Sequence, residues 1–402
     1  MCPPNAGAHT RQEHTTGPPF PSRDELQPEL DRVPRVVLAH VVDVHCHPTD
    51  SDFAMTLEAA SDLPIRICAM ATRRSDQQLV ADFAEACPDK VVPCFGYHPW
   101  FYHWISLGPI SSKDAHYRAL FLPSSDSTPP KPELVSAFEK LLPFLPDPIL
   151  LSDVLSDVRT RLTTFPNAML GEVGIDRAFR VPYSHPVDPP FAAVYDAPRD
   201  GPREVSPFTT PLAHQLAILE AQLALAAELR RNVSLHSVKC QQATVELLDR
   251  MKTVHGPAWL RISVDLHSCG LSAQTWTQLS KRHPNAFLSL STAINARSPA
   301  HRALAAACAP DRLLVESDFP DVRGSAPYTW NMLQTVADVK GWRIEDAWDD
   351  SYAAAPEAEW GAVRRLEENW KLFERGGHAE RVSTKRRRDR AIEEWEAGAE
   401  SD

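Results

Sequence analysis

Six side chains suited to binding metal ions follow short apolar segments of this chain. His45 and His47 end the run VVDVHCH, where an extended backbone directs both imidazoles to the same side. The others are Glu172, His236, His267 and Asp318. Imidazole and carboxylate are ligands that Zn²⁺ and similar ions prefer, and six exceed what one catalytic ion with an open water position uses. The set predicts two divalent ions, about 3.5–4 Å apart, bridged by one carboxylate.

Each of these residues has a simpler interpretation when it is taken alone. An HxH pair is weak evidence in a chain with 16 histidines. His236 and His267 could be hydrogen-bonded core residues, and Asp318 could cap the helix that follows it. The metal prediction therefore depends on the whole constellation, in which all six residues fall at the ends of five predicted strands.

Eight short apolar runs alternate with helical segments and supply these strands. The predicted strands are 41–45, 65–71, 91–97, 168–175, 233–238, 261–267, 286–292 and 313–318. The clearest helix is 211–231, which opens with a proline and is apolar at helical spacing. Eight strands that alternate with helices are typical of a (β/α)8 TIM-type barrel in the α/β class, whose site lies at the carboxyl ends of the strands.

Proline concentrates outside this alternation. The chain has 36 prolines and only 15 glycines in 402 residues. We expect a disordered Pro-rich leader over 1–35, a barrel over 36–375 and a charged disordered tail over 376–402. Two insertions interrupt the barrel, near 102–165 and 177–210. Because the second insertion directly follows a strand, it should lie over the catalytic face.

Charge and cysteine usage indicate where the protein works. With 42 Lys+Arg and 53 Asp+Glu the formal net charge is −11, which argues against a basic coat for non-specific nucleic-acid binding. The eight cysteines are scattered, and no apolar run approaches the ~20 residues that span a bilayer. We expect a cytoplasmic and/or nuclear protein without a membrane segment. KRRR at 385–388 is either a nuclear-import signal or part of a solvated tail.

The ordered motifs VDVHCH, GYHPW, GEVGID, SLHSV, DLHS, LVESDFP and ENWKLF resemble those of the TatD-related metal-dependent hydrolases, the TatD DNase family of the amidohydrolase superfamily. The resemblance covers roughly 36–375 and implies a hydrolase barrel with DNase activity. It implies that one ion is held by His45, His47 and Asp318 and the other by His236 and His267, with Glu172 as the bridge. Many superfamily members instead bridge their ions through a carbamylated lysine, and this chain has none at that position.

Other positions matched to the family concern the substrate. His98 matches the histidine of the family's GxHP turn, and Asp176 matches the acid of GEVGID. Position 238 is valine where relatives have an arginine, and Arg177 stands where they have an aromatic residue. The metal positions are thus retained while substrate-facing positions differ. The residues considered as substrate or phosphate contacts are His98, Arg177, Lys239 and Arg297, with ordinary surface charge as the alternative for the three basic residues.

These observations predict a divalent-metal-dependent hydrolase, a TatD-type deoxyribonuclease or phosphodiesterase that attacks a nucleic-acid end with a metal-activated water. Asp318 is the expected proton acceptor and Glu172 the second catalytic carboxylate. Zn, Mg, Mn and Co all suit such ligands. One alternative is a hydrolase of a small ester, amide or phosphoester. Another is a protein that binds a partner through its insertions, with a secondary hydrolase site, because fungal relatives with such insertions are known as partners of cell-cycle machinery.

Overall fold

Eight parallel strands form the central sheet, in the order β1-β2-β3-β6-β7-β8-β9-β10. The computed structural model describes residues 21–123, 129–185, 204–349 and 356–380. The strands are β1 Val42–Cys46, β2 Arg66–Met70, β3 Val91–Phe95, β6 Met169–Asp176, β7 Val233–Val238, β8 Val264–Leu266, β9 Ala286–Ser291 and β10 Leu313–Glu316. Each matches one predicted run, and the predicted (β/α)8 barrel is confirmed.

The barrel is nearly closed where the last strand meets the first. The backbone N–H of Asp318 donates to the carbonyl of His45 at 2.9 Å, and that of His47 donates to the carbonyl of Phe319 at 2.9 Å. These bonds hold the ends of β10 and β1 together. The two ends therefore bring residues more than 270 positions apart in sequence to one place.

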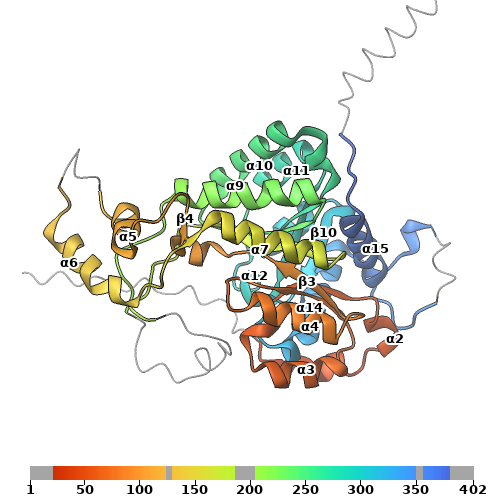
Figure 1. Cartoon of the computed structure of the whole chain (residues 1–402). Coiled ribbons are helices and arrows are strands. Elements are labelled where there is room, and N and C mark those ends of the chain that lie inside the picture. The colour runs from red at the N-terminus through yellow and green to blue at the C-terminus, as the bar shows by residue number, and fades with distance from the viewer. Residues whose placement is uncertain (1–20, 124–128, 186–203, 350–355, 381–402) are drawn as a thin grey trace, which may run out of the picture.

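Helices cover the outside of the sheet, so most strands are buried on both faces, which explains their continuous apolar runs. The surrounding helices are α2 Arg35–Leu38, α3 Phe53–Ser61, α4 Gln77–Ala86, α7 Leu151–Thr164, α9 Leu212–Leu229, α10 Gln241–His255, α11 Ala273–Arg282, α12 Thr292–Asn295, α13 Ala300–Ala307 and α14 Val322–Lys340 (Figure 1). The predicted helix 211–231 is confirmed as α9. Within the described residues, none of the helices combines the length and apolarity needed to cross a bilayer.

The last helix, α15 (Ala362–Arg375), seals the barrel interior at the end opposite the strand carboxyl termini. Trp370 and Phe373 are buried against apolar side chains of β1, β2, β3 and β10. Asn369 donates to the carbonyls of Pro310 and Leu313, which ties α15 to the start of β10. The ENWKLF motif therefore has a packing role here.

The structure differs from the expected leader over 1–35, because helix α1 (Arg23–Leu30) lies within that span. Ser22 and Glu25 form a reciprocal capping box at its first turn. Leu26 and Leu30 are one helical turn apart and buried, and α1 packs against α14. The cap, the two leucines and the packing against α14 support this helix, although the surrounding proline content suggests disorder. Residues 1–20 lie outside the described residues.

The first insertion forms a separate lobe beside the barrel, at the left of Figure 1. It contains β4 (Ile105–Ser106), α5 (Lys113–Phe121), α6 (Pro132–Leu141) and β5 (Ile149–Leu150), and β4 pairs with β5 in a small parallel sheet. The insertion is shorter than the expected 102–165, because α7 packs on α9 and β3 and belongs to the barrel.

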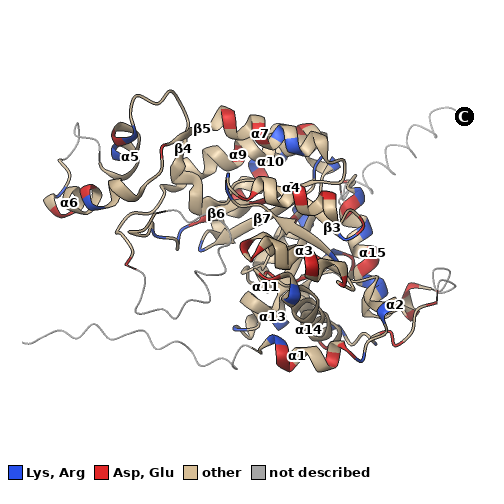
Figure 2. Ribbon diagram, turned by 60° about the horizontal axis from the view of Figure 1, so that its bottom comes forward, with Lys and Arg blue, Asp and Glu red and all other residues tan. Residues whose placement is uncertain are grey.

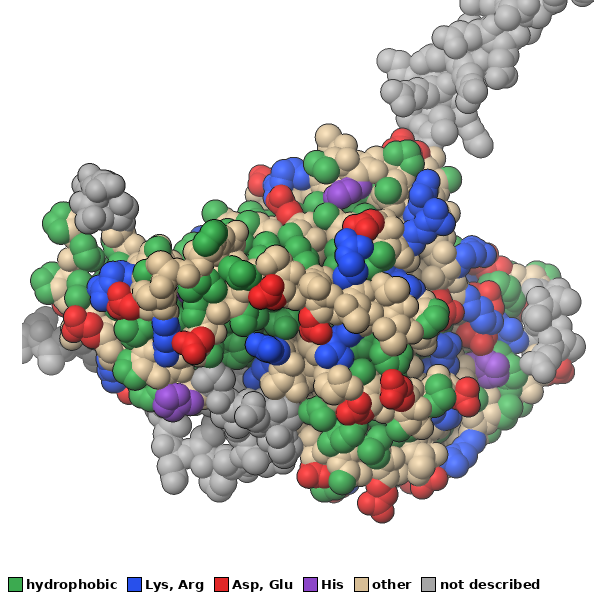
Figure 3. Space-filling model, in the orientation of Figure 1, with side chains coloured by type: hydrophobic (Ala, Val, Ile, Leu, Met, Phe, Trp, Pro, Cys, Tyr) green, Lys and Arg blue, Asp and Glu red, His purple; other side chains and the backbone are tan. Residues whose placement is uncertain are grey.

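The lobe has a hydrophobic cluster of its own, to which the second insertion contributes. Its buried members are Tyr117, Leu122, Phe138, Leu141, Leu145, Val181 and Phe208. Val181 and Phe208 come from the described parts of the second insertion, 177–185 and 204–210, which a bridge between Pro182 and Val205 joins. Figure 3 shows hydrophobic side chains over this part of the molecule. The two insertions thus build one structure.

Candidate metal centre

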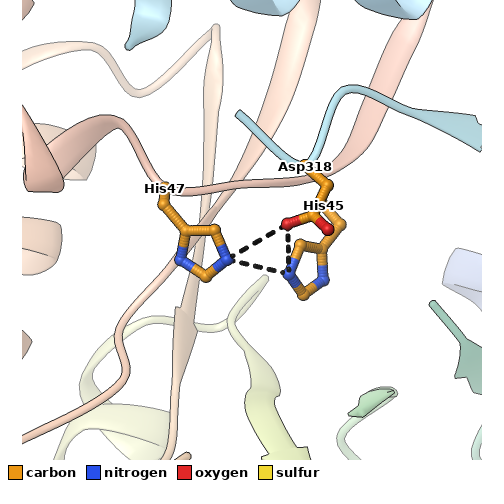
Figure 4. Close-up of side chains that lie close together, drawn as sticks. All are labelled: His45, His47 and Asp318. Atoms are coloured by element: carbon orange, nitrogen blue, oxygen red, sulfur yellow. Dashed lines mark hydrogen bonds and ion pairs between the residues drawn. The ribbon is translucent and has the colours of Figure 1, made fainter. Parts of the chain in front are cut away.

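Four side chains meet at the carboxyl end of the barrel. His45 Nε2 and His47 Nε2 lie 3.1 Å apart. Glu172 Oε2 is 3.5 Å from His45 Nε2 and 3.2 Å from His47 Nε2. Asp318 Oδ1 is 3.9 Å from His45 Nε2 and 3.5 Å from His47 Nε2. Figure 4 shows both imidazoles directed at the Asp318 carboxylate. These atoms surround one point.

The other oxygen of Glu172 faces a second group of imidazoles. Glu172 Oε1 is 2.7 Å from His267 Nε2 and 2.8 Å from His236 Nδ1. It is also 3.3 Å from His98 Nε2, and His236 Nδ1 lies 3.2 Å from His267 Nε2. The structure therefore brings all six predicted ligand residues together, with the two oxygens of one carboxylate turned to different sets.

The donor atoms have the chemistry and spacing that a divalent ion requires. Tetrahedral ligands at bonds of about 2.1 Å lie roughly 3.4 Å from one another. The atoms of the first group are separated by 3.1 to 3.9 Å. They comprise two imidazole nitrogens and two carboxylate oxygens, which are ligand types that such an ion uses. Imidazole nitrogens that face each other at these distances repel unless a proton or a cation lies between them. The residues present therefore fit a divalent ion.

The carboxylates of this cluster are held ionised. Burial raises the pKa of Glu172, but nearby imidazoles, led by His98 and His267, outweigh it and hold that pKa well below its ordinary value. Burial likewise opposes ionisation of Asp318, and the hydrogen bond from His47 leads the interactions that lower its pKa. Two buried anions side by side need positive charge nearby, which the imidazolium form or a bound cation supplies.

Asp318 reaches the cluster through an unusual backbone conformation. Its φ is 51°, in the left-handed region that non-glycine residues rarely adopt and that aspartate tolerates better than most. The turn lies directly after β10 and places Asp318 where its carboxylate meets His45 and His47. Such conformations gather at functional sites, because the surrounding structure must hold them in place.

Residues behind the cluster orient its imidazoles, and the sequence analysis did not find them. His45 Nδ1 is 2.7 Å from the hydroxyl of Ser234, which leaves Nε2 for the cluster. Glu316 is fully buried and lies 3.6 Å from His267 Nδ1. It accepts hydrogen bonds from the amide and hydroxyl of Ser268, both at 2.7 Å. Glu316 is the last residue of β10, two positions before Asp318, and a carboxylate at a strand end is the signal that could have revealed it.

A protonated carboxyl completes this buried network. The Ser289 hydroxyl lies 2.7 Å from Asp265 Oδ2 and 2.6 Å from Glu316 Oε2. One hydroxyl donates only one proton, so the second contact needs a proton from a carboxyl. Burial, together with the charge of Glu316, raises the pKa of Asp265 to about 8. The raised pKa favours Asp265 as the carboxyl that carries this proton.

Asp176 joins the cluster to an aromatic side chain. Its Oδ2 accepts a hydrogen bond from Trp100 Nε1 at 2.6 Å and lies 3.5 Å from His236 Nε2. Its Oδ1 accepts from the amides of Ala178 and Phe179. Burial raises the pKa of Asp176, but the interactions with His236 and Trp100 outweigh burial and lower this pKa to about 2. Asp176 therefore remains an anion that positions both ring systems.

A cavity of about 700 Å³ opens over the cluster. His98 lies in its wall, whereas Arg177 and Lys239 are exposed and are not among the lining residues. Arg73 and Arg297 line it instead, and Arg73 was not found by the sequence analysis. Figure 2 shows basic and acidic residues interspersed over the described helices, in keeping with the net charge. Among the described residues that line the cavity, the arginines are Arg73 and Arg297.

A (β/α)8 barrel with histidines and carboxylates gathered at the carboxyl ends of its strands defines a metal-dependent hydrolase. The sequence profile of the family described as TatD related DNase matches residues 42–356. The chain belongs to this family, as the ordered motifs predict. It is a hydrolase of ester bonds that binds divalent metal.

Two yeast proteins are similar to this chain over most of their length. Cut9-interacting protein scn1 of Schizosaccharomyces pombe is 29% identical over 340 residues, which cover 76% of this chain and 94% of that protein. Uncharacterized deoxyribonuclease YMR262W of Saccharomyces cerevisiae is 24% identical over 345 residues, 83% of this chain and 98% of that protein. Among solved structures, the TatD homolog YJJV of Escherichia coli matches at 17% identity and a TM-score of 0.48, over 84% of this chain and 98% of that one.

Proposed function

We propose that this protein is a two-metal phosphodiesterase that hydrolyses nucleic acid, in particular DNA, from a strand end. One observation carries the proposal: the two oxygens of Glu172 face two separate groups of imidazoles. A bridging carboxylate with this arrangement suits a pair of ions, and paired ions are typical of enzymes that cleave phosphodiesters. Of the two ions, one would be held by His45, His47 and Asp318 and the other by His236 and His267, with Glu172 shared.

Divalent ions, when bound, supply Lewis-acid polarisation of the phosphoryl oxygens and lower the pKa of water toward neutrality. The chain's own residues do the rest. Asp318 Oδ accepts the proton of the attacking water, since its carboxylate is held ionised within the cluster. His98, 3.3 Å from Glu172 Oε1, contributes an imidazole at the cavity wall, and burial lowers its pKa to about 4. Zn, Mg, Mn and Co remain candidates for the ions.

The test is digestion of end-labelled single-stranded DNA in the presence of each candidate metal, by the wild type and by Asp318→Asn. The wild type should shorten the DNA and the variant should not. The matched control is Asp89→Asn, which changes an exposed aspartate before β3, at the other end of the barrel. A folded, metal-loaded wild type that leaves DNA intact with every ion would refute the proposal. Turnover of small chromogenic esters without DNA cleavage would establish the small-ester alternative.

Protein binding is a second candidate role, favoured by the separate hydrophobic cluster of the lobe. The relative named Cut9-interacting protein carries an interaction in its name, and we infer that the insertions of this chain offer a comparable docking surface. Replacing 107–147 with a short linker and comparing co-purified partners tests this role. Unchanged partners would contradict it.

We also propose that the protein works in the cytoplasm and/or nucleus. The KRRR run at 385–388 lies outside the described residues. A deletion of 381–402 spares His378, whose backbone N–H donates to Leu260. If the protein leaves the nucleus on that deletion, the deleted segment contains an import sequence. Unchanged localisation would contradict an import role for KRRR.

A further inference from the structure

One wall of the cavity beside the metal cluster is aromatic. Its rings are Trp100, Phe101, Trp104, Phe144, Phe179 and Tyr183. They come from three segments: the 3-10 helix Pro99–Trp104 after β3, the 3-10 helix Leu142–Phe144 of the lobe, and the chain after β6. Three of the six belong to the insertions and three to the turn after β3, so the barrel and the insertions build this wall together.

The wall presents apolar surface to the cavity. Trp100 is 37% exposed and Ile294 is 50% exposed, and both line the cavity. They are two of only seven large hydrophobic side chains that are exposed in the described part of the chain. Exposed apolar groups gathered in a concave site mark a place where a ligand lies.

Four of the six rings pack against one another in two pairs. Trp100 and Phe179 stack with ring centres 5.2 Å apart and planes at 15°. Trp104 packs against Phe101, with centres 4.7 Å apart. The hydrogen bond from Trp100 to Asp176 connects this wall to His236 of the metal cluster. A ligand on the wall is therefore placed at a set position relative to the cluster.

Two arginines line the same cavity, and one of them, Arg73, forms ion pairs with Asp50 at 3.9 Å and Asp76 at 3.8 Å. The guanidinium carbon of Arg73 is 4.5 Å from the centre of the Phe101 ring, and Arg297 is a second lining arginine. Aromatic faces with guanidinium groups are the surfaces on which proteins stack nucleobases and contact the phosphates beside them. A cavity of about 700 Å³ is in the size range of small-molecule pockets. It takes one unpaired strand end with its base, and not the body of a duplex.

We propose that the aromatic wall is a subsite for the unpaired terminal base of a nucleic-acid strand whose scissile phosphodiester lies at the metal cluster. This inference rests on the phosphodiesterase function proposed above. The base stacks on the rings around Trp104 and Tyr183, while the cluster acts on the phosphodiester. The subsite makes the enzyme favour strand ends that carry a base over abasic ends.

The test compares two single-stranded oligonucleotides that differ only in whether the terminal nucleotide carries a base or is abasic, with either the 3′ or the 5′ end blocked. The wild type should show kcat/KM about tenfold higher for the base-bearing strand, mainly through KM. Trp104→Leu should reduce this preference toward one, and Trp104→Phe should retain most of it. The control Trp342→Leu changes a half-buried tryptophan that does not line the cavity, and it should keep the full preference.

The outcomes separate the two proposals. Equal cleavage of both strands by the wild type overturns the subsite and leaves the phosphodiesterase function intact, and this comparison needs no variant. An unchanged preference in folded Trp104→Leu and in Trp104→Leu combined with Tyr183→Leu also overturns it. If the metal-loaded wild type cleaves neither strand, both proposals fail together.

Discussion

The two sides of the cavity differ in exposure and in what holds them together. On the barrel side, His45 and Glu172 are 0% and 3% exposed, and their neighbours are polar atoms of other strands. On the aromatic side, Trp100 is 37% exposed and its ring stacks on that of Phe179. The polar side is built from the ends of strands whose register the whole barrel fixes. The aromatic side combines the turn after β3 with the insertions, which have a hydrophobic cluster of their own.

This difference separates chemistry from selection of the substrate. A change in the register of one strand would move its ligands away from those of the other strands, so the geometry of the metal cluster depends on the barrel. The lobe can vary by side-chain substitution, because its cluster does not include barrel strands. The following changes test whether the two sides are as independent as their packing indicates.

The largest effect is expected on the barrel side. Glu172→Gln removes the charge that both imidazole groups face, and should cost several kcal/mol of transition-state stabilisation, more than about 10³-fold in kcat. Metal analysis should show fewer ions per chain. Glu85→Gln, at an exposed position in α4, should change neither quantity. Full metal content with full activity in Glu172→Gln would remove the bridge from the mechanism.

Phe138→Ala tests whether the lobe can lose stability without any loss of metal from the cluster. Phe138 is fully buried in the lobe cluster, so the substitution should cost the lobe about 3–4 kcal/mol. Hydrogen exchange of the α5 and α6 amides should accelerate while metal content remains unchanged. Phe287→Ala, in the equally buried barrel interior, should instead lower the stability of the whole barrel. Loss of metal from Phe138→Ala would show that the two sides are coupled.

Glu316→Gln tests the residues behind the cluster. Its side chain lies 3.6 Å from His267 Nδ1, and loss of its charge should weaken metal affinity or activity by about 10–100-fold. Isothermal titration calorimetry of the metal-free proteins with the divalent ion measures this change in metal affinity. The control is Glu345→Gln, a buried glutamate that accepts from the amide of Val363 at the start of α15. Equal metal affinity in wild type and Glu316→Gln would assign Glu316 to packing alone.

The smallest effect concerns pH and His103, at the junction of barrel and lobe. Burial, together with His116 and His214, lowers the pKa of His103 to about 3. The unfolded chain takes up this proton near pH ~6.5 and the folded chain does not, so stability falls as pH drops below ~6.5, by about 1–2 kcal/mol at pH 5. Urea unfolding at pH 7.5 and 5 should show a smaller loss for His103→Gln. His185→Gln, at an exposed position on the cavity rim, should behave as the wild type.

Much of the fold was predictable because its signals are local. Each buried parallel strand of the barrel is a continuous apolar run, and the helices between them follow their own period, so the eight barrel strands were predicted, whereas the short strands β4 and β5 were not. Helix α1 was missed, because its cap and two leucines lie in a stretch dominated by proline. The extent of the first insertion was overestimated, since only packing against α9 shows that α7 belongs to the barrel.

The sequence by itself determined the barrel, the family and the six residues that meet at its mouth. Their types and their places at strand ends follow from order along the chain. Only the tertiary structure decided which oxygen of Glu172 faces which imidazoles, that Glu316 lies behind His267, and that Arg73 reaches the cavity where Arg177 does not. The reason is physical: strand order fixes which backbones are neighbours, while side-chain direction and the course of an insertion depend on packing that no local pattern encodes.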